Sequence, residues 1–216
     1  MITEYFKSKG LKFIVEPTDK LFTCVDDGGV ESETGEFLYG FIRRLKPQKV
    51  LTTGIYTGVS DLYIAQALKE NGFGKTTALE FEQFHITRAK ELWNKMGVGT
   101  FIEPHLTDSL KFEPKEKYQF MFLDTEPFLR FKELDKFYSS LDDGGYVFIH
   151  DMPRSLCQGN INPDHPDFKH WPVGEIPQNI INLLIKGELV KFHFGSARGL
   201  VGFYKVNKDD YEYRRV

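Results

Sequence analysis

The chain has 216 residues, of which 41% are hydrophobic and 27% are charged. These values are typical of one compact globular domain with a sizeable core, and they exclude a collagen-like, disordered or disulfide-stapled chain. The formal net charge is −3 and the sequence has no Lys/Arg block. General nucleic-acid binding is therefore not expected, because affinity for phosphates needs clustered cations.

The cysteines and the apolar runs indicate the compartment. Cys24 and Cys157 are too few for a disulfide framework and lack the C-x-x-C spacing of zinc or redox sites. The apolar run at 180–185 is much shorter than the ~20 residues of a membrane span. The N-terminal segment MITEYFKSKG is charged and lacks the apolar part of a secretory signal. We expect a cytoplasmic protein that does not enter a membrane.

Short β-branched and aromatic runs alternate with stretches of helical period, which is the pattern of βαβ units and a mainly parallel sheet. Strands are predicted at 49–53, 76–81, 100–104, 118–123, 146–150, 189–194 and 200–206. A glycine-bounded connection joins the last two runs, which predicts a hairpin and one antiparallel edge strand. The predicted fold is therefore a doubly wound, Rossmann-like α/β sheet of seven strands.

Helices are expected between the strands, where apolar residues recur at intervals of three and four. They are predicted around 38–45, 62–68, 86–96 and 128–141, with a further helix near 178–186. Pro47 ends the first of these helices, because the residue before a proline disfavours the α region. Pro127 precedes the fourth helix and suits its first position.

A glycine turn follows the first of these strands. The turn reads Gly54-Ile55-Tyr56-Thr57-Gly58, and a helix opens directly after it at Val59-Ser60-Asp61. Glycine lets a backbone turn sharply and approach a ligand closely, and the amides at a helix N-terminus are available as donors. The G-x-x-x-G spacing differs from the G-x-G-x-x-G of dinucleotide enzymes, which disfavours NAD or FAD. A purely structural turn is the alternative.

Polar residues end the next two strands. Glu80, between Leu79 and Phe81, occupies the place where nucleotide-binding α/β folds put a carboxylate on the ribose hydroxyls. A solvated charge is the alternative, and it suits Glu82 better. Residues 107–108 follow the third strand, in a position from which side chains can reach an adenine edge.

Two later strands end in Asp124 and in His150-Asp151. If these strands are neighbours, about 4.8 Å apart, two carboxylates and an imidazole can share a divalent cation. His150 can equally serve as a general base, because its pKa lies near working pH. The alternatives are that Asp124 only shapes a ligand pocket and that His150 is a hydrogen-bonded core residue.

The segment 152–177 holds five of the ten prolines and little helical pattern. A connection of this length inside a compact domain is usually functional or disordered. Loops at the carboxyl edge of such sheets carry specificity, so His170 and Trp171 are candidate substrate contacts. An exposed loop position is the alternative for His170.

The order of these motifs resembles the class I S-adenosylmethionine-dependent methyltransferases. The resemblance is greatest to the O-methyltransferase branch around catechol O-methyltransferase and bacterial sugar and macrolide O-methyltransferases. It covers about 30–206 and rests on VESETGEFLYGFIRRLKPQKVLTTGIYTGVS, ALEFE, TDSL and the strand ends FLD and HD. The cofactor-binding residues that it implies are Gly54, Ile55, Tyr56, Gly58, Ser60, Glu80, Phe81, Thr107, Asp108 and Asp124.

The resemblance implies methyl transfer from S-adenosylmethionine to a hydroxyl of a small molecule, a sugar or a phenol. It implies catalytic roles for His150 and Asp124, and Mg or another divalent cation as an optional cofactor on Asp124, His150 and Asp151. An N-methyltransferase, an aminopropyl-type transferase and a cofactor-binding protein without catalysis stand as alternatives.

Three positions depart from the family pattern. Thr52 stands where the family usually has an acid that helps to hold the amino group of the cofactor. Pro127 replaces the lysine base of catechol enzymes, and Met152 replaces their asparagine metal ligand. Catechol chemistry is therefore not expected.

The predicted domain organisation is an N-terminal extension at 1–30, forming a lid or a homodimer contact, and a methyltransferase domain at 31–216.

Overall fold

The structure is a computed structural model that describes residues 1–17, 19–26, 28–152, 175–194, 198–207 and 209. The chain divides into two compact units, Met1–Ser109 and Leu110–Val216. None of the helices in the described ranges has the length and apolar character that crossing a membrane requires.

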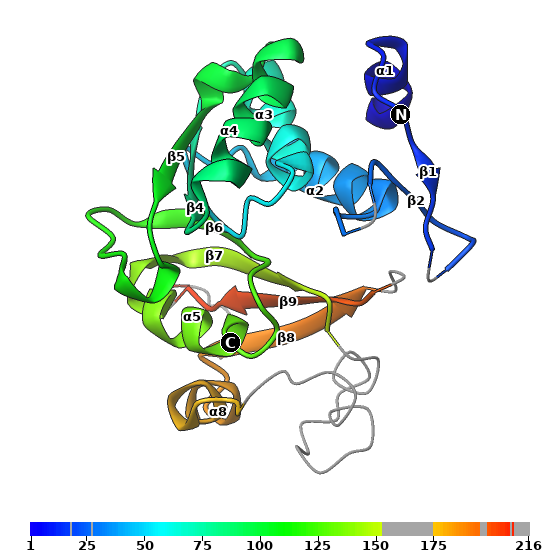
Figure 1. Ribbon diagram of the computed structural model, residues 1–216. Helices are drawn as coiled ribbons and strands as arrows, with labels where there is room; N and C mark the ends of the chain where they lie inside the picture. The colour runs from blue at the N-terminus through cyan, green and yellow to red at the C-terminus, as the bar shows by residue number, and fades with distance from the viewer. Residues whose placement is uncertain (18, 27, 153–174, 195–197, 208, 210–216) are drawn as a thin grey trace. The chain divides into compact units, whose positions relative to one another are not determined.

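The first unit is built around three parallel strands (Figure 1). These are β3 (Lys49–Thr53), β4 (Lys75–Glu80) and β5 (Ile102–Leu106). The register pairs Thr53 with Leu79 and Glu80 with Leu106. The carboxyl ends of the three strands therefore meet at one edge, which is where the sequence predicted ligand-binding residues.

The helices of this unit follow the predicted apolar periodicity. They are α2 (Ser32–Leu45), α3 (Val59–Asn71) and α4 (Gln83–Lys95), and a 3-10 turn, η1, follows at Gly99–Phe101. Every residue of α3 from Val59 to Leu68 is buried, as its broad apolar face predicted. Helix α2 ends at Leu45, directly before Lys46 and Pro47, which confirms the stop signal.

The N-terminal segment packs within the same unit. Helix α1 (Ile2–Ser8) is followed by an antiparallel pair, β1 (Ile14–Val15) and β2 (Thr23–Cys24). The Thr3 amide donates a hydrogen bond of 2.7 Å to Glu36 on α2, and Thr3 Oγ1 lies 2.8 Å from the hydroxyl of Tyr63. Phe6 is fully buried against the Tyr63 ring. These contacts fix α1 on α2 and α3, whereas a lid or homodimer role for 1–30 stays a prediction.

The second unit contains β6 (Tyr118–Leu123) parallel to β7 (Leu141–His150), followed by the hairpin β8 (Leu189–Phe194) and β9 (Leu200–Lys205). Strand β9 runs antiparallel to β7 and to β8. The seven strands have the order β5-β4-β3-β6-β7-β9-β8. The predicted seven-stranded, mainly parallel α/β fold is confirmed.

The helix predicted at 128–141 is shorter than its apolar pattern. Helix α5 spans Arg130–Phe137, and a 3-10 turn, η3, continues to Tyr138–Ser140. Leu141 instead begins β7 and pairs with Tyr118, so β7 starts before the predicted 146. Pro127 precedes the helix by more than one residue, so its expected placement at the first helical position is wrong. A short turn, η2, spans Ser109–Lys111, and α8 spans Gln178–Ile185, near its predicted bounds.

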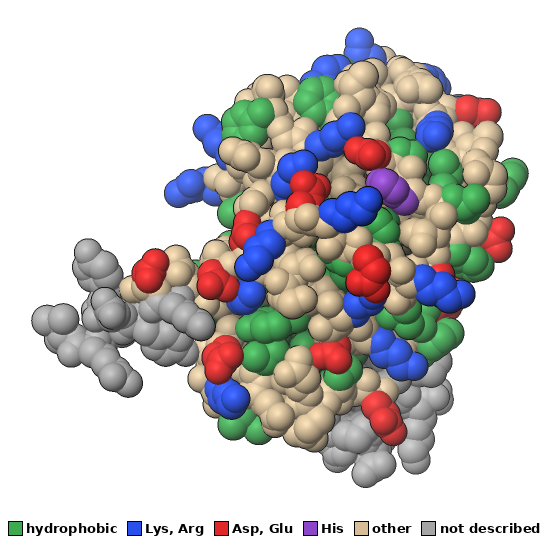
Figure 2. Space-filling model, turned by 90° about the vertical axis from the view of Figure 1, so that its left-hand side faces the viewer, with side chains coloured by type: hydrophobic (Ala, Val, Ile, Leu, Met, Phe, Trp, Pro, Cys, Tyr) green, Lys and Arg blue, Asp and Glu red, His purple; other side chains and the backbone are tan. Residues whose placement is uncertain are grey.

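The charge distribution agrees with the composition. On the face drawn in Figure 2, acidic and basic side chains are interspersed among hydrophobic ones, in keeping with 28 Lys and Arg against 31 Asp and Glu.

Candidate functional site

The turn after β3 requires glycine because of its backbone conformation and the close packing of α4. Gly54 and Gly58 both have φ of +78°, in the left-handed region that favours glycine. A Cβ on Gly58 would lie 2.7 Å from both Ala89 Cβ and Trp93 Nε1 on α4. The Trp93 indole N–H also donates a hydrogen bond of 2.8 Å to the Gly58 carbonyl. Close packing of α4 on the turn therefore accounts for Gly58 on structural grounds.

The acid at the end of β4 points at this turn. Glu80 Oε2 accepts a hydrogen bond of 3.0 Å from the amide of Tyr56, in the middle of the turn. Its Oε1 accepts hydrogen bonds from the amides of Phe81 and Glu82, at 2.9 and 3.0 Å. The Glu80 side chain is 5% exposed, whereas Glu82 is exposed. The structure thus brings Glu80 to the glycine turn and leaves Glu82 as a solvated charge.

Aromatic side chains flank this carboxylate. Phe81, the next residue in the sequence, is 68% exposed. Tyr56, whose amide donates to Glu80, is 39% exposed. The Tyr56 ring meets the ring of His85 edge-on at 5.2 Å, and His85 Nδ1 lies 3.5 Å from Glu80 Oε1. A nearly buried carboxylate between exposed aromatic faces suits a ligand with a polar and an aromatic part. His85 was not predicted, because nothing in its helical position distinguishes it in sequence.

The remaining predicted residues of this unit lie close to the same strand ends. The Thr107 amide donates a hydrogen bond of 2.8 Å to the Glu80 carbonyl, and Thr107 and Asp108 are both partly exposed. Ile55 and Ser60 are buried, at 2% and 6% exposure. The Ile55 and Ser60 side chains are therefore packed in the interior beside the turn.

The missing acid at Thr52 has a counterpart on α3. Thr52 Oγ1 donates a hydrogen bond of 2.7 Å to Asp61 Oδ1, and both residues are buried. Asp61 lies in the first turn of α3, directly after the glycine turn. A buried carboxylate thus lies beside Thr52, but on the helix rather than on the strand.

The N-terminal segment reaches the turn as well. Asp26 Oδ1 lies 3.5 Å from Thr57 Oγ1, and its Oδ2 lies 3.4 Å from Arg88 on α4. A Cβ on Gly28 would lie 3.2 Å from the Tyr56 ring. Residues ahead of α2 therefore border the glycine turn.

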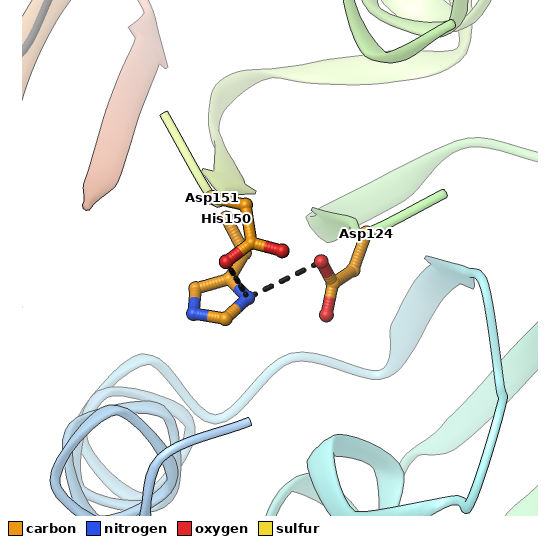
Figure 3. A group of neighbouring side chains, drawn as sticks. All are labelled: Asp124, His150 and Asp151. Carbon is orange, nitrogen blue, oxygen red and sulfur yellow. Dashed lines mark hydrogen bonds and ion pairs between the residues drawn. The ribbon is translucent and has the colours of Figure 1, made fainter. Parts of the chain in front are cut away.

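The second unit brings together the other predicted side chains (Figure 3). Asp124 follows β6, His150 ends β7 and Asp151 comes next. His150 Nδ1 lies 3.2 Å from Asp124 Oδ1 and 3.6 Å from Asp151 Oδ1, and the ligand atoms of all three lie within 4.8 Å of one another. The Nε2 atom of His150 points away from Asp124 (Figure 3). His150 is 1% exposed.

Sequence reasoning missed a fourth member of this cluster. Arg130, the first residue of α5, places Nη2 3.3 Å from Asp124 Oδ1 and 3.4 Å from Asp151 Oδ2. Its Nε donates a hydrogen bond of 2.7 Å to the Thr125 carbonyl, and its Nη1 donates to the His150 carbonyl. The side chain is 3% exposed. A charged residue at the start of an amphipathic helix ordinarily faces solvent, so sequence gave no reason to single it out.

The candidate substrate contacts His170 and Trp171 lie outside the described residues, as does most of the insert at 152–177. Met152 is described and is 1% exposed, and its amide donates to the Gly199 carbonyl at 3.3 Å. Its thioether offers nothing useful to a hard cation.

A model of the O-methyltransferase family matches residues 3–162. The chain belongs to the O-methyltransferase family. This family member is 26% identical over 143 residues to the tapetum-specific methyltransferase 1 of Arabidopsis thaliana, covering 63% of this chain and 60% of that protein. It is 25% identical over 127 residues to a putative O-methyltransferase of Mycobacterium sp. (strain KMS), covering 57% of each. The chain thus spans 57–60% of the length of these curated relatives.

Solved structures of O-methyltransferases share the fold of this family member. The O-methyltransferase TomG from Streptomyces achromogenes, involved in tomaymycin synthesis and solved with S-adenosylmethionine, superposes with a TM-score of 0.66 at 18% identity, over 84% of this chain and 83% of TomG. An O-methyltransferase from Bacillus cereus, solved with S-adenosylhomocysteine, superposes with a TM-score of 0.61 at 14% identity, over 94% and 88% of the two chains. At these identities the likeness shows the fold.

Proposed function

We propose that this chain is an S-adenosylmethionine-dependent O-methyltransferase that methylates a hydroxyl of a small molecule, a sugar or a phenol. Family membership and the cofactors bound by TomG and the Bacillus cereus protein support the reaction class. The observation that carries the proposal is the Glu80 carboxylate, which is fixed by three backbone amides beside exposed Tyr56 and Phe81.

The proposed cofactor site lies in the first unit. Glu80 accepts hydrogen bonds from the two ribose hydroxyls, as carboxylates at this position of nucleotide-binding α/β folds do. Phe81, which is exposed, would contact the adenine, and Thr107 and Asp108, which are partly exposed, would bond its edge. The glycine turn, 54–58, would hold the methionine part of the cofactor.

When bound, the cofactor supplies a methyl group on a positively charged sulfur. The acceptor oxygen forms a bond to the methyl carbon as the carbon–sulfur bond breaks, and S-adenosylhomocysteine leaves. The protein must align the acceptor and take its proton. Carboxylates only accept hydrogen bonds, so His150 Nδ1, between Asp124 and Asp151, carries the hydrogen. The lone pair of the neutral ring is then on Nε2, and we propose that this atom takes the hydroxyl proton while Asp124 stabilises the resulting imidazolium. The acceptor hydroxyl must reach Nε2 for this step.

A matched pair of variants tests the cofactor site. Glu80→Gln removes the charge and leaves an amide nitrogen that cannot accept, whereas Glu82→Gln makes the same change two positions away on an exposed side chain. Hydrogen bonds to charged groups contribute about 1.5–3 kcal/mol, so Glu80→Gln should weaken S-adenosylhomocysteine binding roughly 10- to 150-fold in calorimetric titration. Glu82→Gln should leave the affinity unchanged. The proposal fails if the wild-type protein does not bind the ligand, or if both variants lose the same affinity.

A cofactor-binding protein without catalysis is the second candidate function. It is favoured by the burial of His150, which is 1% exposed. Transfer of a labelled methyl group to any member of a panel of phenols and sugars would exclude it. Binding of S-adenosylmethionine without methyl transfer to any member of that panel would favour it, as would an unchanged cofactor affinity in His150→Gln.

Two further parts of the proposal come from the sequence. We propose that the insert at 152–177, with His170 and Trp171, contacts the acceptor, and that 1–30 forms a lid or a homodimer contact. The second suggestion gains support from Asp26 and Gly28, which border the glycine turn.

A further inference from the structure

We propose that the guanidinium of Arg130 is the built-in cation of the cluster formed by Asp124, His150 and Asp151, and that this cluster therefore holds no divalent metal. The inference rests on the proposed function only for its consequence in catalysis. The donor set by itself, two carboxylates and an imidazole within 4.8 Å, would suit Mg²⁺, Mn²⁺ or a transition metal. The question is what already neutralises these donors.

Arg130 occupies the bridging role that a shared cation would have. Its Nη2 is nearly equidistant from Asp124 Oδ1 and Asp151 Oδ2, at 3.3 and 3.4 Å. These carboxylates follow two different strands, β6 and β7, so a single guanidinium nitrogen connects both strand ends. A metal shared between the same oxygens would have to displace this nitrogen.

The guanidinium is held too firmly to be displaced readily. Its Nε and Nη1 donate to the carbonyls of Thr125 and His150, and Nη1 also lies 3.3 Å from the Asp151 carbonyl. The side chain is 3% exposed, so its charge is shielded from solvent. The planar guanidinium presents its donors in a rigid fork, which suits it to buried contacts with carboxylates.

The charge count points the same way. Arg198 adds a second guanidinium, with Nε 3.5 Å from Asp151 Oδ1. Among the described residues, two carboxylates therefore face two guanidinium groups, which already balance their charge. His150 Nδ1 already makes a 3.2 Å hydrogen bond with Asp124 Oδ1, so a metal on that nitrogen would have to replace this bond.

The consequence for the proposed reaction is that it needs no added metal. Arg130 acts as a positioning residue, because it fixes Asp124 and Asp151, and these in turn orient His150. Activation of the acceptor then depends on proton transfer to His150 rather than on a Lewis acid.

Titration with Mn²⁺, followed by electron paramagnetic resonance, tests the inference without requiring turnover. The wild-type protein should show no site tighter than about 1 mM, the weak end of protein sites for hard divalent cations. Arg130→Met removes the internal cation and leaves the donors, so it should bind Mn²⁺ at least about tenfold more tightly than wild type. Lys136→Met is the matched control: it removes one positive charge from the same helix, where Lys136 pairs with the exposed Glu113. It should behave as wild type.

Each outcome bears on the proposal. A tight Mn²⁺ site in the wild-type protein that is lost in Asp124→Asn overturns it, and this measurement stands even if Arg130→Met does not fold. A folded Arg130→Met that binds no more tightly than Lys136→Met also overturns it. Titration of the same samples with S-adenosylhomocysteine separates this inference from the proposed function. If the wild-type protein does not bind S-adenosylhomocysteine, the proposed function is rejected and the Mn²⁺ result is unaffected.

Discussion

Gly58→Ala should be strongly destabilising, and the structure supplies a matched control at the other end of the same helix. Gly58 and Gly72 flank α3, with φ of +78° and +82°. A Cβ at Gly58 would meet Ala89 and Trp93 at 2.7 Å, whereas a Cβ at Gly72 would meet nothing within 4 Å. The two alanine variants therefore share the cost of a left-handed backbone and differ in packing.

The magnitudes follow from these two terms. A left-handed non-glycine residue costs about 1–2 kcal/mol, which is the whole expectation for Gly72→Ala. Overpacking of a close contact adds about 1–3 kcal/mol, so Gly58→Ala should lose roughly 2–5 kcal/mol of unfolding free energy. Urea unfolding followed by circular dichroism measures both variants under the same conditions. Equal losses at the two positions would refute the argument that α4 packing dictates Gly58.

Two further variants test a buried carboxylate, Asp61, and an exposed one, Glu70. Thr52→Val leaves Asp61 without a 2.7 Å hydrogen bond inside the core and should lower the unfolding free energy by about 1–3 kcal/mol in urea melts; an unchanged midpoint would contradict the bond. Burial alone raises the pKa of Glu70, but hydrogen bonds from Tyr39 and Gln66 outweigh it and hold the pKa below 4.5. Such a group stabilises the fold above pH 4.5 and ceases to do so as the pH falls through its folded pKa. Glu70→Gln should therefore flatten the decline of stability in acid; an unchanged slope would contradict this.

The sequence predicted what depends on local periodicity and on strand ends. The strands β3, β6 and β8 have their predicted bounds, because each is a β-rich run with clear punctuation on both sides. Glu80 was placed at the glycine turn because parallel strands align their carboxyl ends. Leu141 was assigned to a helix because its apolar spacing continued that of α5, but pairing with Tyr118 in the sheet outweighed this local pattern.

The residues that sequence missed are those whose role depends on a distant partner. Arg130 meets Asp124 and Asp151 only because α5 begins beside the ends of β6 and β7. Asp61 meets Thr52 only because the glycine turn folds α3 back along β3. Neither contact has a periodicity or spacing by which sequence alone could identify it.

The buried pair of Thr52 and Asp61 also limits the order in which this chain can change. Introducing an acid at Thr52 while Asp61 is present would enclose two carboxylates side by side, and replacing Asp61 alone would leave the Thr52 hydroxyl without its acceptor. The two positions are therefore epistatic, and each single step passes through an unfavourable intermediate.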